Sequence, residues 1–99
     1  MASVQSIDVP WYREAEYADL RASVEDPQTM HATHAEWLKA ATDGVDQLIA
    51  QGFTVNKVDF DQQLFFAWCR WRGRKVDTHA RSDFAVERAA TLAEKSNHS

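Results

Sequence analysis

The chain has 99 residues, a formal net charge of −4 and 44% hydrophobic residues, among them four Trp, five Phe and two Tyr. This length is close to the commonest domain size, so we expect a single domain over 1–99 with its own core. No apolar run approaches the ~20 residues of a membrane helix, and the first residues lack the pattern of a secretory signal. A single cysteine, Cys69, excludes an intramolecular disulfide. These features argue against a membrane protein and favour a cytoplasmic location.

Charge is distributed unevenly along the chain. Residues 1–69 carry eleven acidic and four basic side chains, a sum of −7, whereas residues 70–99 carry seven basic and four acidic ones, a sum of +3. This asymmetry can orient a partner or a second copy of the chain, or it can cancel within one folded surface.

The first elements are predicted from apolar spacing and from two prolines. Residues 1–9 contain Val4, Ile7 and Val9 with polar neighbours, which permits an N-terminal arm or a short strand. Pro10 suits the first turn of a helix, and the apolar residues that follow it repeat at helical spacing. We therefore expect a helix over 11–24, ended before Pro27 because the residue preceding a proline avoids the α region.

The second helix has the clearest start signal. Thr33 and Glu36 fit a capping box, in which the threonine hydroxyl accepts from the backbone N–H of the glutamate. A wide apolar stripe follows, and Gly52 supplies the left-handed residue that closes many helices. The pattern predicts a helix over 34–51.

Residues 53–59 are rich in aromatic and β-branched types and predict one short strand. An isolated strand leaves backbone groups unpaired, so a partner strand is required. It can come from the N-terminal segment or from a second copy across a two-fold axis, and because a two-strand ribbon still has open edges we expect a homodimer.

Two more helices complete the expected fold. Asp61 can cap a third helix that ends at Gly73, and Asp77 can cap a fourth, with residues 96–99 fraying. The third helix is expected to bury one stripe: Leu64, Phe65, Trp68 and Trp71. Together, these elements predict an α+β fold with about four helices and one short strand.

Several short patterns together resemble a group of small bacterial proteins of unknown function. They are Trp11-Tyr12-Arg13, Tyr17 with Leu20, Glu36-Trp37-Leu38, Gly52 before a strand, Trp68-Cys69, Gly73, and Ala80-Arg81 followed by Phe84-Ala85. The resemblance covers about residues 11–86 and implies a shared fold. Because these are mostly core and capping positions, it implies no catalytic or binding residue.

Metal binding and catalysis have weak signals. His31 and His34 form an H-x-x-H pair, and a zinc site would need Cys69 and His79 as further ligands. Specific zinc signatures contain two closely spaced ligand pairs, whereas this sequence has one. Cys69 lies beside the stripe of the third helix, where a small buried hydrophobe is the favoured interpretation over a nucleophile. We therefore assign no catalytic residue, no metal ligand and no cofactor.

The most unusual stretch is 68–75, where four cations lie beside two tryptophans. Such a segment can grip phosphates and stack a base, or it can dock a protein. The structural alternative is that the cations favour a helix C-terminus and pair with the acidic residues of 1–69, while the tryptophans are buried. The candidate binding residues are Arg70, Trp71, Arg72, Arg74 and Lys75.

Three functions follow in order of preference. The first is a small protein-interaction module that binds a protein partner or itself. The second is a nucleic-acid-binding protein that uses 68–75, which the net charge of −4 disfavours. The third is a small enzyme of unidentified chemistry, for which the sequence offers no support beyond scattered carboxylates.

Overall fold

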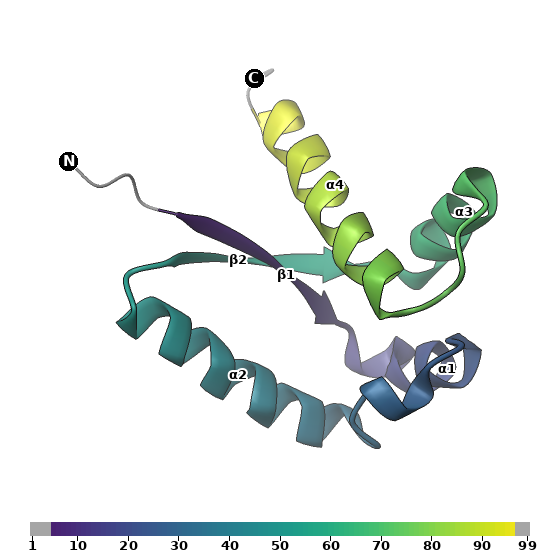
Figure 1. Ribbon diagram of the computed structural model, residues 1–99, viewed down its shortest axis with the longest axis horizontal. Helices are drawn as coiled ribbons and strands as arrows, with labels where there is room; N and C mark the ends of the chain where they lie inside the picture. Colours follow the sequence, from purple (N-terminus) through teal and green to yellow (C-terminus); the bar gives the residue numbers. More distant parts are fainter. Residues whose placement is uncertain (1–4, 97–99) are drawn as a thin grey trace.

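The computed structural model describes residues 5–96 and has an α+β fold with four helices and a two-stranded sheet (Figure 1). This confirms the predicted fold class. The elements in chain order are β1 (Ser6–Tyr12), α1 (Glu14–Ser23), a 3-10 turn (Pro27–Thr29), α2 (His34–Ala50), β2 (Thr54–Phe60), α3 (Gln62–Arg72) and α4 (Thr78–Ser96). Ser96 is still helical, and the rest of the predicted frayed tail, 97–99, lies outside the described residues.

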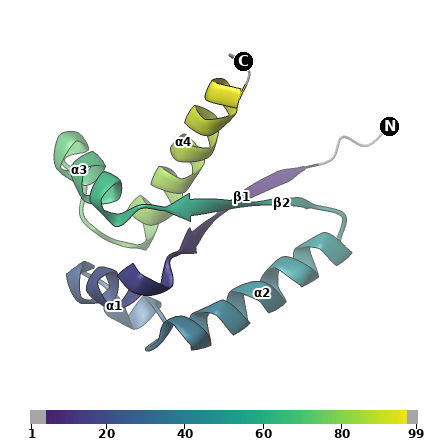
Figure 2. The same cartoon turned by 180° about the vertical axis from the view of Figure 1, so that it is seen from behind.

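The sheet consists of β1 and β2 side by side and parallel, with Ser6 opposite Thr54 and Tyr12 opposite Phe60. The N-terminal segment therefore supplies the partner that the strand at 53–59 was expected to need. Residues 1–4 of the predicted N-terminal segment lie outside the described residues. The helices α2 and α4 lie on opposite sides of the strands, and α1 and α3 lie beyond their carboxyl ends (Figures 1 and 2).

The prediction of a first helix over 11–24 was wrong at its start. Trp11 and Tyr12 belong to β1, and α1 begins only at Glu14. Pro10 lies inside the strand, opposite Val58, although it suits a helix start equally well. Both strands of a two-stranded sheet are edge strands, and an edge is where a sheet tolerates the missing N–H of proline.

The capping signals were predicted correctly. The Thr33 hydroxyl accepts from the backbone N–H of Glu36 at 3.2 Å, and α2 begins at His34. The Asp61 carboxylate accepts from the first turn of α3, and the Asp77 carboxylate accepts from the N–H of Ala80 in α4. Gly73 ends α3 with φ +64°, the left-handed conformation that L-residues rarely adopt.

The core is aromatic and lies where the helices meet the carboxyl ends of the strands. Phe60 of β2 contacts Phe65 of α3 and Phe84 of α4, with ring centroids 4.9 and 5.4 Å away. Tyr17 and Leu20 of α1 are also almost completely buried. Aromatic groups of this size bury more apolar area per residue than any others, which suits a chain of 99 residues with a small core.

The predicted buried stripe of α3 was partly wrong. Phe65 is fully buried, but Leu64 and Trp71 are exposed, and the second deeply buried residue of α3 is Cys69. The core therefore meets α3 along Phe65 and Cys69, which lie one turn apart, and leaves Trp71 on the outer side. In α4, Ala80 and Phe84 are buried, whereas Leu92 is 40% exposed.

A buried ion pair joins α4 to the segment that follows α1. Arg81, only 3% exposed, donates to Asp26 at 3.2 Å, to the Thr29 hydroxyl at 3.0 Å and to the Tyr12 hydroxyl at 3.1 Å. The other oxygen of Asp26 accepts from the backbone N–H of Thr78 at 2.9 Å. Burial raises the pKa of Tyr12 despite this cation. Burial alone would also raise the pKa of Asp26, but the hydrogen bonds from Thr78 and Arg81 outweigh it and lower that pKa.

None of the helices within residues 5–96 has the length and apolar character that crossing a membrane requires.

The ion pair predicts how stability depends on acid. Because the pKa of Asp26 is lower in the folded state, its stabilisation is present above the ordinary Asp value of about 4 and is lost as pH falls through the lower folded pKa. We expect Asp26→Asn to lose about 3 kcal/mol at pH 7, because Arg81 stays buried without a counterion, and to flatten the acid dependence. Urea unfolding at several pH values measures both. The control Asp59→Asn, which breaks an exposed pair with Arg13, should cost less, and an unchanged pH slope in Asp26→Asn would contradict the assignment.

Candidate functional site

The five predicted binding residues lie together at the end of α3 and in the loop that follows it. Arg70, Trp71 and Arg72 form the last turn of the helix, and Arg74 and Lys75 follow Gly73. The left-handed Gly73 reverses the chain at this point, so that α4 can pack against α3. This turn brings Arg72 and Arg74 close to carboxylates of α4.

These two cations pair with carboxylates of α4. Arg72 forms an ion pair with Glu87, which also accepts from the indole N–H of Trp68 at 3.0 Å. Arg74 pairs with Asp83 at 3.0 Å. The expectation that the cations of this segment pair with the acidic residues of 1–69 was therefore wrong for both. Their partners lie within 70–99, because the Gly73 turn places α4 nearer than any acidic residue of the first part of the chain.

The tryptophans of the segment have different environments. Trp68 is half-buried and packs against Phe84, with the two ring centroids 5.7 Å apart. Trp71, in contrast, is 80% exposed. The guanidinium of Arg72 lies 5.4 Å from the ring centroid of Trp68 and 5.3 Å from that of Trp71. Arg72 is therefore close to one carboxylate and to two aromatic rings, within the distance of a cation–π interaction.

A shallow groove of about 310 Å³ lies on the outer side of the α3–α4 contact. Apolar and charged side chains from both helices line it: Leu64, Trp68, Trp71, Arg72, Phe84, Glu87, Arg88 and Thr91. We refer to the surface of this groove as the α3–α4 surface. Arg70 and Arg74 lie outside it and line a separate groove with Ser23 and Phe66. Sequence reasoning found Trp71 and Arg72 but missed the groove, because the groove depends on how two helices meet.

The remaining sequence candidates have structural roles. The Nε2 atom of His34 lies 2.9 Å from the Tyr12 carbonyl oxygen, and the His31 carbonyl accepts from the Tyr17 hydroxyl at 2.7 Å. Among residues 5–93, no three His, Cys, Asp or Glu side chains come close enough together to hold a metal ion. Burial raises the pKa of the Cys69 thiol, although Arg74 partly opposes this effect, so the thiolate needed by a nucleophile is disfavoured.

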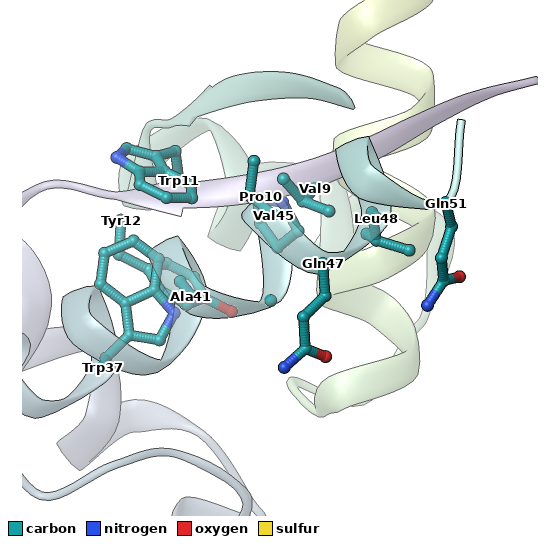
Figure 3. Close-up of a pocket in the computed structure, with 11 residues that line it drawn as sticks. Val9, Pro10, Trp11, Tyr12, Trp37, Ala41, Val45, Gln47, Leu48 and Gln51 are labelled. Carbon is teal, nitrogen blue, oxygen red and sulfur yellow. The ribbon is translucent and has the colours of Figure 1, made fainter. Parts of the chain in front are cut away.

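A second groove, about 440 Å³ in volume, lies between β1 and α2 (Figure 3). Trp11, Tyr12 and Trp37 gather at one end of it, and the side-chain amides of Gln47 and Gln51 lie at the other. No sequence signal indicated this groove, because its two walls come from elements whose packing cannot be read from spacing.

No protein-family model, curated protein or solved structure matches this chain. The resemblance to small bacterial proteins stays a prediction, and the functional argument rests on the geometry of the surfaces described above.

The environment of Cys69 predicts slow reaction with thiol reagents. The side chain is 2% exposed and its pKa is raised, so at pH 7.5 iodoacetamide should modify the folded protein far more slowly than the urea-unfolded chain. Mass spectrometry of timed samples measures both rates. Equal rates would show that Cys69 is accessible and would reopen the nucleophile hypothesis.

Proposed function

We propose that this protein is a small protein-interaction module that docks a partner on the α3–α4 surface. The observation that carries the proposal is Trp71, which is 80% exposed beside an apolar groove, with the Arg72 guanidinium 5.3 Å from its ring centroid. Tryptophan and arginine dominate the energetic centres of protein interfaces, where they are surrounded by a polar rim.

The charges on this surface favour a partner segment of one chemistry. Arg72 is paired with Glu87, but Arg88, which also lines the groove, has no carboxylate within 4.0 Å among residues 5–93, whose side chains the structure describes. A partner with apolar side chains for the groove and carboxylates at its flanks would complement both features. We therefore propose an acidic, amphipathic segment of another protein as the partner.

Substitution of Trp71 tests this proposal. The full-length protein is used to capture partners from its native cell, and mass spectrometry identifies and quantifies them. We expect Trp71→Ala to weaken capture of the specific partner by about tenfold or more, the loss of a hot-spot residue of about 2 kcal/mol. Val86→Ala, which truncates a residue of α4 that is 53% exposed and lies away from the groove, is the matched control. Equal capture by wild type and Trp71→Ala would contradict the proposal.

The two alternative functions remain predictions of lower rank. A nucleic-acid binder would use the same five residues, but the ion pairs of Arg72 and Arg74 leave fewer cations for phosphates. Affinity for nucleic acid would fall steeply as the salt concentration rises, because it depends on phosphate contacts. Apolar docking of a protein at Trp71 would depend on salt much less. For an enzyme, no residue described above combines the exposure and the pKa shift that catalysis requires.

We also propose that the protein forms a homodimer through the outer edge of β2. The N–H of Thr54 donates to Gln5 at the start of β1, so by alternation Val55, Lys57 and Asp59 direct their backbone groups outward. An antiparallel two-fold pairing about Val58 would place Lys57 opposite the partner's Asp59, and the reverse. Opposite charges across strands favour such a register, and two-fold dimers are the commonest soluble assemblies.

Light scattering at micromolar concentration tests the dimer. We expect about twice the chain mass of 11.3 kDa for the wild type. Lys57→Asp should give the monomer, because it would place two carboxylates opposite each other, whereas Lys39→Asp on α2 makes the same charge change away from this edge. A wild-type mass near 11.3 kDa would sink the dimer, and a dimer that survives Lys57→Asp would exclude this register.

A further inference from the structure

The groove between β1 and α2 has the dimensions and lining of a binding site. Its volume of about 440 Å³ falls within the range of about 300–1,000 Å³ typical of ligand sites, and its walls are mainly apolar. Its lining on α2 extends from Trp37 to Gln51, a distance of about 21 Å at 1.5 Å per residue. A trench of this length fits an extended chain of about six residues better than it fits a compact small molecule.

The groove runs along the open edge of β1. In a parallel ladder, the backbone groups of successive residues point alternately to the two sides of the strand. The carbonyl of Gln5 accepts from Thr54 of β2, so Asp8, Pro10 and Tyr12 point away from β2. The Tyr12 carbonyl indeed meets His34, the first residue of α2. The edge at Asp8 and Pro10 has no backbone partner in the described part of the chain.

The aromatic contacts agree with this placement. Side chains of neighbouring strand residues project to opposite faces of a sheet. Trp11 and Tyr12 nevertheless both contact Trp37, with ring centroids 5.0 and 4.9 Å away. One residue of α2 can meet both faces in this way because α2 lies along the edge of the strand, with the groove between them (Figure 3).

A glycine in the wall of the groove leaves space for a backbone. Gly44 lies within α2, where glycine costs about 1 kcal/mol relative to alanine. A Cβ atom at this position would meet no atom within 4 Å, so packing inside the chain does not require glycine here. The space above Gly44 opens into the groove, where an incoming main chain can approach α2 closely.

Charge around the groove indicates which segment it would take. Glu36 and Asp43 lie on the same side of α2 as Gln47, which lines the groove. Asp8 has its backbone on the open edge of β1, and its carboxylate accepts from the side-chain amide of Asn56 at 2.9 Å. Near the groove these carboxylates face one cation, Lys57, which lies 4.6 Å from the ring centroid of Trp11. A segment with cationic flanks complements these groups.

We infer that this groove binds an extended peptide segment of another protein, which adds to β1 as a third strand. Its alternate side chains are apolar and enter the groove, and lysine or arginine residues flank them. The carbonyls of Asp8 and Pro10 accept from its backbone, and the N–H of Asp8 donates to it. Pro10 has no N–H to donate, so the apolar side chains contribute a larger share of the affinity than in ordinary strand addition. This site is separate from the α3–α4 surface and does not depend on the function proposed there.

The test uses a phage library of random linear peptides, selected on the full-length protein after depletion on the Gly44→Leu variant. Leucine at this position fills the groove and is a better helix former than glycine, so thermal unfolding should show a variant at least as stable as the wild type. We expect the selected peptides to alternate apolar residues between basic flanks. Their affinity should fall about tenfold or more in Gly44→Leu and persist in Thr42→Leu, which makes a matched change on the far side of α2.

Amide NMR spectra of the protein report directly on strand addition. The N–H of Asp8 should shift on peptide binding, and the N–H of Val9, which points to β2, should shift less. Several results would overturn the inference: no peptide enriched over the depleted pool, equal affinity for Gly44→Leu, or an unmoved Asp8 amide. A wild-type dimer that Gly44→Leu converts to a monomer would also overturn it, because the occupant would then be a second copy. If Trp71→Ala loses the partner of the α3–α4 surface, the peptide enrichment, the peptide affinity and the shift of the Asp8 amide should all stay unchanged.

Discussion

The guanidinium of Arg81 is the point on which the arrangement of this fold depends. It is buried at the base of α4 and holds Asp26, Thr29 and the Tyr12 hydroxyl at the same time. A buried cation is stable only with its counterion and hydrogen bonds in place, so α4, the turn after α1 and the end of β1 are fixed together. The aromatic core around Phe60 packs against the elements that this network has positioned.

Both proposed binding surfaces are built outward from this centre. On one side, α4 presents Asp83 and Glu87 to the cations that follow α3, which leaves Trp71 as the exposed apolar feature. On the other side, the end of β1 is anchored at Tyr12 while α2 departs from His34, and the groove lies between them. The first surface combines Arg72 and Arg88 with Glu87, and Glu36 and Asp43 lie on the groove side of α2 at the second. The charge of residues 70–99 is partly balanced within that segment, by the ion pairs of Arg72 with Glu87 and of Arg74 with Asp83.

Sequence reasoning was reliable where a few adjacent residues decide the conformation. Thr33, Asp61 and Gly73 are local signals, and each ends or begins a helix where it was expected to. Reasoning from Pro10 was wrong because proline suits both a helix start and an edge strand, and only pairing with β2 decides between them. Trp71 was assigned to the core because it fits the apolar spacing of α3. Burial depends on which side of the helix meets α4, and spacing along one element does not contain that information.

The parallel pairing of β1 with β2 also sets an order of events when the chain is made. Ser6 lies opposite Thr54, so the first strand cannot pair until the 48 further residues that lead to Thr54 have been synthesised. At about 5–20 residues per second, the ribosome takes several seconds to supply that partner. Both α1 and α2 are complete before β2 exists, and the sheet, on which α4 and the buried Arg81 pair depend, forms only afterwards.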